Sequence, residues 1–299
     1  MDGISAETHY KKIRQVLLWI LVLNWAVACA KLIYGILSHC VSMTADGFHS
    51  FSDGTSNIVG LIGIFLACQP KDKEHPYGHK KYETFFSLGI AALLFLVAFE
   101  LVQQGIQRFS KPLIPTIDIG NFIVMAATLM INILVMRYEF KIGREFKSDI
   151  LISDSMHTKA DILTSLSVIV TMAAIKLGVS SVLDPIVTIM IALFIAHEAF
   201  EIARQSSRVL CDEAAILDDQ KIADIVLGVK GVRTCHKIRS RGRPDDIYID
   251  LHVQVAPDMH VDRAHAVSYA IEEAIKKNIP EVTDVVVHVE PKEKTPSKP

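Results

Sequence analysis

Long apolar runs alternate with short polar links over the first two thirds of the chain. A helix needs about 20 mostly apolar residues to cross the hydrocarbon core of a bilayer. Six windows meet this requirement, at residues 15–37, 41–66, 84–107, 118–138, 150–177 and 181–203. The pattern therefore predicts an α-helical membrane protein whose residues 1–205 form six transmembrane helices in a lipid bilayer.

The pattern changes near residue 206 to the periods of a small mixed domain. Two segments have the spacing of amphipathic helices, residues 214–229 and 261–277. Three segments alternate as strands do, residues 232–239, 247–255 and 283–290. We expect the run RSRGRPDD to turn between the first two strands, and Asp262 to cap the second helix.

This order of elements predicts a small cytoplasmic α+β domain of the αββαβ, metallochaperone-like type over residues 206–290. The remaining residues, 291–299, are charged and rich in proline. We expect this tail to be disordered, because such a composition buries too little apolar surface to fold.

Basic residues are concentrated in the segments that six spans assign to one side of the membrane. These segments hold Lys11, Lys12, Arg14, Lys71, Lys73, Lys80, Lys81, Arg137, Lys141, Arg144 and Lys147. Basic residues stay on the cytoplasmic side. The first apolar run is long for a signal peptide and lacks a convincing cleavage site. We therefore expect a multi-pass protein of a prokaryotic cell (inner) membrane, with both termini cytoplasmic.

Composition agrees with a membrane protein and excludes other classes. The chain of 299 residues is 51% hydrophobic, with a mean hydropathy of +0.34. Its net charge of −2 gives no reason to expect a nucleic-acid partner. The five cysteines include no C-x-x-C pair, so no disulfide framework is predicted.

The pattern D-x-x-H-x-x-x-D occurs twice within the apolar windows. The first copy, in ADGFHSFSD, consists of Asp46, His49 and Asp53, and the second, in SDSMHTKAD, of Asp154, His157 and Asp161. These offsets put each triad on one stripe of a helix. Such groups are costly in hydrocarbon, so each stripe needs a compensating partner. One interpretation is that they only join helices or contact water. Two identical triads favour a site for a divalent cation.

The second and fifth windows are antiparallel in this layout, so His49 can lie level with Asp161, and Asp53 with His157. Two imidazoles and two carboxylates complete a tetrahedral ligand set suited to zinc. The empty site should take up a proton, which metal binding then expels. Asp46 and Asp154 fit a role in the ion pathway or as acceptors for the histidine N–H better than direct ligation.

The two H-x-x-x-D motifs, the HPYGH that follows the second window and the layout of six spans plus a small domain resemble the cation diffusion facilitator family. The resemblance extends from the first span to Glu290. It implies a homodimeric transporter that exports cytoplasmic Zn²⁺ in exchange for protons, with Cd²⁺, Co²⁺ or Fe²⁺ as further substrates. His49, Asp53, His157 and Asp161 match the transport site of the family.

Two further metal sites are expected. His75 and His79, with Asp72 nearby, suit one exposed metal in the loop after the second span, although two histidines in a polar loop are common. On the strands, His288 and Glu290 share a face, and His236 can face His252. The resemblance implies a cytoplasmic metal site at the dimer interface, formed by His236, His252, His265, His288 and Glu290.

The resemblance also implies a charge interlock between Lys81 and Asp212, which would join the membrane helices to the small domain. Other functions remain open. A metal-sensing or assembly protein on the same fold would transport nothing, although the complete ligand set favours transport. A membrane metalloenzyme would need an open coordination position and a general base, and no HExxH occurs.

Overall fold

A computed structural model describes residues 3–37, 41–110, 119–176, 183–216 and 218–292. The chain divides into two compact units, Met1–Ser207 and Arg208–Pro299. The predicted disordered tail lies almost entirely beyond residue 292, outside the described residues. Each unit has its own hydrophobic core and is described by itself.

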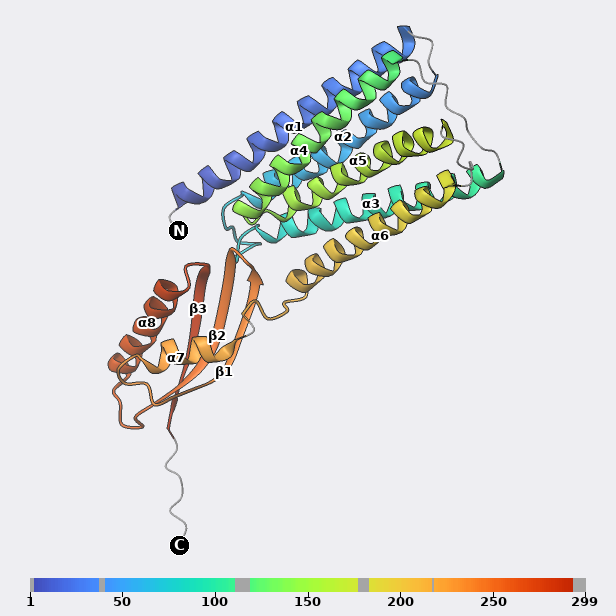
Figure 1. Cartoon of the computed structure of the whole chain (residues 1–299). Helices are drawn as coiled ribbons and strands as arrows, with labels where there is room; N and C mark the ends of the chain where they lie inside the picture. Colours follow the sequence, from blue (N-terminus) through green and yellow to red (C-terminus); the bar gives the residue numbers. More distant parts are fainter. Residues whose placement is uncertain (1–2, 38–40, 111–118, 177–182, 217, 293–299) are drawn as a thin grey trace. The chain divides into compact units, whose positions relative to one another are not determined.

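The first unit is a bundle of long helices that run side by side (Figure 1). They are α1 (Gly3–Leu37), α2 (Val41–Ala67), α3 (Lys81–Ser110), α4 (Ile119–Glu145), α5 (Asp149–Lys176) and α6 (Leu183–Leu210). Each of the six predicted windows falls on one of these helices. A first cluster of buried apolar residues contains side chains from each of the helices α1, α2, α3, α4 and α5. A second cluster connects α3, α5 and α6 through small residues such as Ala98, Ala160 and Ala192.

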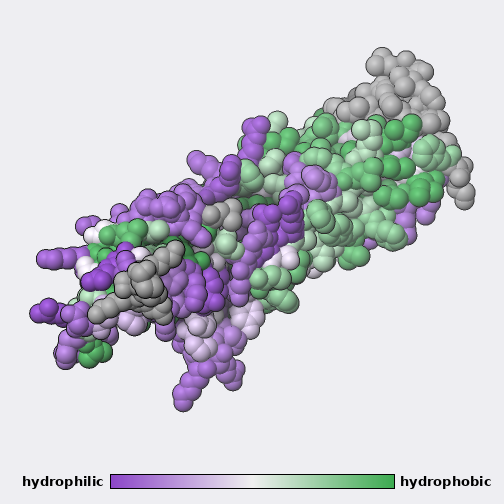
Figure 2. Space-filling view, turned by 90° about the horizontal axis from the view of Figure 1, so that it is seen from below, coloured by the Kyte–Doolittle hydropathy of each residue, from purple (hydrophilic) through white to green (hydrophobic). Residues whose placement is uncertain are grey.

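The outer surface of the bundle is apolar, as lipid contact requires. Large side chains expose 61% to 75% of their surface at Trp19, Leu37, Phe99, Met190 and Leu193. Hydrophobic residues cover much of the visible face of the helical unit, whereas hydrophilic residues dominate the α+β unit (Figure 2).

Four helices in the described part of the chain have apolar stretches long enough to cross a membrane. These stretches are Tyr10–Tyr34, Lys81–Gln107, Ile123–Glu145 and Pro185–Leu210. Side chains in parts of α2 and α5 lie outside the described residues, and the described part of α2 contains the shorter apolar stretch Gly54–Ala67. The role of α2 and α5 as membrane spans, and with it the count of six, stays a prediction.

Two glycines bring α2 close to α3 and α5. A Cβ atom on Gly63 would lie 2.6 Å from Cβ of Phe86 on α3 and 2.7 Å from Cδ1 of Ile150 on α5. A Cβ atom on Gly60 would lie 2.9 Å from Cγ2 of the same isoleucine. A larger side chain at either position therefore requires Phe86 or Ile150 to shift, so the two glycines allow α2 to pack closely against α3 and α5.

The second unit has the predicted order of helices and strands. Its elements are α7 (Asp219–Leu227), β1 (Thr234–Arg243), β2 (Asp246–Val255), α8 (Val261–Asn278) and β3 (Val282–Pro291). The sheet order is β1-β2-β3, with β1 antiparallel and β3 parallel to β2. Alternate residues of β2, such as Ile249, Leu251 and Val253, pack with Val267 and Ile271 of α8 in the core. The residues between them lie on the opposite face of the sheet.

Three local expectations need correction. The first helix of this unit, α7, begins at Asp219 with Asp218 as its N-cap, whereas the sequence predicted a start near residue 214. β1 extends to Arg243, so most of RSRGRPDD is strand and the turn is short. The N-cap of α8 is His260, whose side chain accepts from the backbone N–H of Asp262, and Asp262 lies in the first helical turn. Both can act at a helix start, because an acceptor and an acidic group are each favourable there.

The contact at Gly63 can be tested by substitution. We expect Gly63→Ala to lower the stability of the protein in detergent by about 1–3 kcal/mol, because the added methyl group overpacks the α2–α3–α5 contact. Gly89→Ala is the matched control, since its Cβ atom would meet only Cγ1 of Val59 at 3.8 Å. That change should leave the melting temperature equal or raised. Equal melting temperatures for the two variants would contradict the close approach.

Candidate functional site

A polar pocket lies within the helical unit. Its empty volume is about 600 Å³, part of it open to the surroundings. The lining residues come from α1, α2, α4 and α5: Asn24, Val27, Lys31, Ser50, Ser56, Asn132, His157, Thr158, Asp161, Thr164 and Ser165. Polar side chains among apolar helices are costly unless they contact other polar groups, so this pocket is a candidate binding site for a charged substrate.

The second triad contributes two of its three members to this pocket. His157, which is 6% exposed, and Asp161 lie one turn apart on α5 and both line it. Asp154 does not line the pocket and is 1% exposed. The side chains of the first triad, Asp46, His49 and Asp53, lie outside the described residues. The structure therefore describes one half of the predicted transport site.

Asp154 belongs to a chain of buried polar groups that connects four helices. Asn24 of α1 donates to Asn57 of α2 over 2.9 Å, and the amide nitrogen of Asn57 donates to Asp154 of α5. Glu139 of α4 hydrogen-bonds Asp154 and accepts from the hydroxyl of Thr158 over 3.1 Å. Each of these groups satisfies another, as burial in a membrane domain requires.

Glu139 was not predicted from the sequence, and it is completely buried. No donor group of the described residues reaches its Oε1 atom or Oδ1 of Asp154. Two carboxylates contain no donor, so a hydrogen bond between them needs a proton on one. Asp154 also accepts from Asn57 and Ser56. A charged residue near the end of an apolar window was the available signal.

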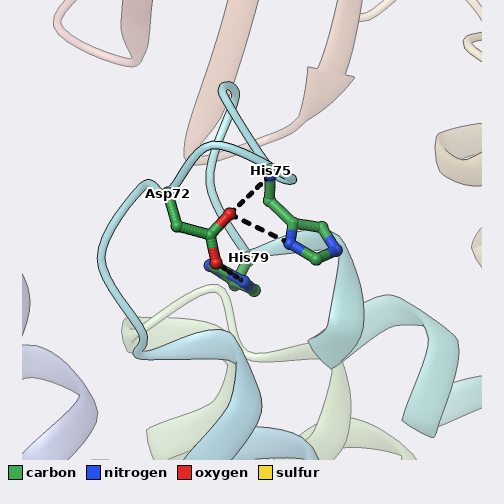
Figure 3. A group of neighbouring side chains, drawn as sticks. All are labelled: Asp72, His75 and His79. Atoms are coloured by element: carbon green, nitrogen blue, oxygen red, sulfur yellow. Dashed lines mark hydrogen bonds and ion pairs between the residues drawn. The ribbon is translucent and has the colours of Figure 1, made fainter.

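The loop between α2 and α3 brings its three predicted residues together (Figure 3). Nδ1 of His75 lies 3.2 Å from Oδ1 of Asp72, and Nε2 of His79 lies 3.4 Å from Oδ2. The two imidazole rings are 4.3 Å apart, and one potential ligand atom from each of the three residues lies within 4.8 Å of the others. A carboxylate between two imidazoles is a ligand set suited to zinc.

The backbone of the loop creates this arrangement. Gly78 has a φ of +93°, which favours glycine, and its N–H donates to the carbonyl of His75 over 2.9 Å. This turn brings His79 back toward Asp72. The backbone N–H of His75 donates to Asp72 over 2.6 Å, and this hydrogen bond lowers the pKa of the carboxyl. Partial burial acts in the opposite direction and raises the pKa, whereas the imidazoles of His75 and His79 lower it further. The carboxylate therefore stays ionised at neutral pH.

A second group of histidines lies on the open face of the small domain's sheet. His236 on β1 pairs directly with His252 on β2, which pairs with His288 on β3. Glu290 connects them: its Oε1 atom lies 2.7 Å from Nδ1 of His252, and its Oε2 atom 3.2 Å from Nε2 of His236. These three could hold a metal ion, with His288 at 3.8 Å from Glu290 beside them.

The contacts of Glu290 depend on ionisation. The hydrogen bond from His252 and the charges of His236, His252 and Lys237 hold the pKa of Glu290 below its ordinary value of 4.5. Folding therefore lowers this pKa, so the contact stabilises the domain above that value. The stabilisation is lost as the pH falls through the folded pKa.

The remaining histidines and Cys235 lie elsewhere. His265 is exposed on α8, its ring edge-on to Tyr269 at 4.7 Å, and α8 covers the opposite face of the sheet. A single chain therefore does not bring His265 to the group around Glu290. Cys235 packs against the apolar core, where burial raises the pKa of its thiol. It points away from its neighbour His236, as predicted.

The predicted interlock joins residues of different units. Lys81 begins α3, and Asp212 follows α6 in a left-handed backbone conformation with φ of +56°. Lys81 belongs to the first unit and Asp212 to the second. Their pairing stays a prediction.

Family models match both units. The model of the cation efflux transmembrane domain matches residues 17–211, and that of the cation efflux protein cytoplasmic domain matches residues 217–292. The chain belongs to the cation diffusion facilitator family. It is therefore an integral membrane transport protein rather than an enzyme, and its helical unit is the transmembrane domain.

Relatives agree with this assignment over most of the chain. An uncharacterised transporter of Methanocaldococcus jannaschii is 29% identical over 286 residues, which are 94% of this chain and 99% of that protein. The manganese efflux system protein MneS of Bacillus subtilis is 26% identical, over 89% of this chain and 91% of its own. The cation-efflux pump FieF of Cronobacter sakazakii is 26% identical, over 84% and 83%. The family resemblance is confirmed.

Solved structures of small metal-binding domains named MamM CTD also match part of the chain. One, a MamM CTD in a manganese form, is 26% identical and covers 25% of this chain and 94% of its own, with a TM-score of 0.24.

The buried contacts of Glu139 with Asp154 and Thr158 predict how its variants behave. Glu139→Ala should lower stability in detergent by about 1–3 kcal/mol, because Asp154 and Thr158 each lose a buried partner. Glu139→Gln should stay near the parent, since an amide donates to Asp154 and accepts from Thr158. Glu145→Gln, at the exposed end of α4, is the control. If Glu139→Gln melts as early as Glu139→Ala, Glu139 does not stabilise the fold through these two contacts.

The histidine group on the sheet can be tested in the segment 206–299, which has its own core. Zinc should raise its melting temperature, because a ligand that binds only the folded state stabilises it. His252→Ala should abolish most of that rise. His260→Ala is the matched control: it removes an N-cap at a cost of up to about 1 kcal/mol and should keep the zinc response. An equal zinc response in both variants would contradict the assigned group.

Proposed function

We propose that this protein exports a divalent metal cation, with zinc as the leading substrate, from the cytoplasm in exchange for protons. The observation that carries the proposal is that His157 and Asp161 of α5 line one polar pocket together with Ser50 and Ser56 of α2. Two borderline or hard ligands in an enclosed membrane pocket suit a small dication better than an organic substrate.

Sequence spacing supports the other half of the site. Asp53 lies three residues from both Ser50 and Ser56, which line the pocket, and His49 lies four residues before Asp53 and seven before Ser56. Offsets of three or four residues share one side of a helix. We therefore assign His49 and Asp53 to the same ion, so that two imidazoles and two carboxylates neutralise and hold one dication.

Proton exchange follows from the charge of this ligand set. Ligands must lose their protons to bind metal, so uptake of the ion releases protons and its loss invites them back. Basic residues at the ends of the spans support cytoplasmic termini. Asp154, which lies behind the pocket with Glu139, is assigned to the support of the site, and Asp46 to the ion pathway.

Manganese is the second candidate substrate. The related MneS is named as a manganese efflux protein. Imidazole nitrogen favours zinc, whereas manganese prefers oxygen. The pocket also offers hydroxyl and amide oxygens from Ser50, Ser56, Asn132 and Thr164, which suit the harder ion. Transport of both metals has to be compared in one preparation, with Cd²⁺, Co²⁺ and Fe²⁺ beside them.

We further propose a homodimer that contains the cytoplasmic metal site. The open face of the sheet presents His236, His252 and Glu290, and His288 with 63% of its side chain exposed. His265, on the other side of the sheet, can join such a site only through a second copy of the chain. The loop group of Asp72, His75 and His79 would then receive or hold the ion near the membrane domain.

A metal-sensing or assembly role without transport remains the alternative. Such a protein would bind metal in the small domain and would not require a polar pocket among the membrane helices. Metal flux separates the two functions directly, because a sensor would bind zinc without moving it.

The decisive measurement is metal uptake into proteoliposomes, with and without a pH gradient. We expect zinc flux that increases with an opposing proton gradient in the parent. Asp161→Ala should reduce the flux at least about 100-fold, because a tetrahedral site loses a charged ligand, while the protein stays folded. Glu198→Gln is the control, since Glu198 pairs with Lys159 at 3.1 Å and does not line the pocket. Full flux in Asp161→Ala would refute the transport site.

A further inference from the structure

A lysine is built into the wall of the metal pocket. Lys31 lies in the apolar stretch Tyr10–Tyr34 of α1 and is 4% exposed. Its Nζ atom donates to the hydroxyl of Ser50 on α2 over 2.9 Å. The same lysine lines the pocket together with His157 and Asp161. The triads therefore do not account for all the charge in this pocket.

An ammonium group is expensive to bury, and the hydroxyl of Ser50, which carries no charge, is only one of the contacts that Lys31 makes. A lysine has three donor hydrogens and a full positive charge, which needs a negative partner in a medium of low dielectric. Among the described residues that line the pocket, Lys31 is the cation and Asp161 the carboxylate. The negative charge that attracts a metal to this pocket therefore also attracts the lysine.

The lysine and the metal then compete for the same carboxylates. A dication in the pocket is repelled by an ammonium group nearby, and the repulsion is strong because little water screens it. This repulsion weakens metal binding, and weaker binding favours transport because a site that binds too tightly does not release its ion.

We propose that Lys31 is the built-in counter-cation of the transport pocket. Its ammonium group compensates the pocket carboxylates when no metal is bound and weakens metal binding enough to permit release. The proposal rests on the proposed transport function and adds a residue that sets affinity against turnover. It differs from a purely structural role, in which Lys31 only joins α1 to α2 through Ser50 and its charge has no effect on the ion.

Charge and hydrogen bonding can be separated by three substitutions in the full chain. Lys31→Met removes both, Lys31→Gln removes the charge and keeps a donor for Ser50, and Lys31→Arg keeps the charge. Binding of Zn²⁺ and Mn²⁺ is measured by titration calorimetry in detergent. Flux of the same ions is measured in proteoliposomes, and the melting temperature reports folding. If Lys31→Met does not fold, Lys31→Gln provides the same comparison.

We expect both neutral variants to bind Zn²⁺ at least about tenfold more tightly, since a repulsive charge is removed, and to show a lower maximal flux because release becomes slow. Lys31→Arg should bind and transport much as the parent does. A folded neutral variant with unchanged or weaker binding would overturn the proposal. So would Lys31→Arg and Lys31→Gln behaving alike. A parent that binds but does not transport any metal would refute the transport function instead, and leave the affinity comparison to judge Lys31.

Discussion

Polar groups inside a membrane must find polar partners, and the helical unit is arranged around this requirement. Asn24, Asn57, Asp154, Glu139 and Thr158 form one connected set across α1, α2, α4 and α5. If any member were apolar, its neighbours would be left unsatisfied in a medium without water. The set lies beside the pocket, so the same contacts that join the helices also hold the turn of α5 that presents His157.

The approach of α2 to α5 is the second condition for the pocket. Gly60 and Gly63 let the two helices pack against Ile150 at distances that a larger residue would prevent. Lys31 then meets Ser50, and the polar side chains of four helices enclose one space. The close packing of α2 against α5 at these glycines therefore allows polar side chains from four helices to meet in one pocket.

The two groups outside the membrane helices use one arrangement in different settings. In the loop, Asp72 lies between His75 and His79, and on the sheet Glu290 lies between His236 and His252. In both groups the pKa of the carboxyl is lower than its ordinary value, and the carboxylate contacts two imidazoles that lie within reach of a single ion. A turn at Gly78 creates the first group and direct pairing across three strands creates the second.

The sequence alone was sufficient for the class of protein, the order of elements and the residues that share a helix stripe or a strand face. Those properties depend on short-range periodicity, so His157 in line with Asp161 followed from spacing. The sequence left the pairing of His236 with His252 open, because spacing along one strand does not fix the register between two strands. The N-cap at His260 and the short turn after Arg243 did not, because neighbouring polar residues compete for such positions. Lys31 and Glu139 lie far in sequence from the residues they contact, and only helix packing brings them to the pocket and to Asp154. Spacing along one helix is a local property, whereas the meeting of charges from different helices depends on how closely, and on which faces, those helices pack.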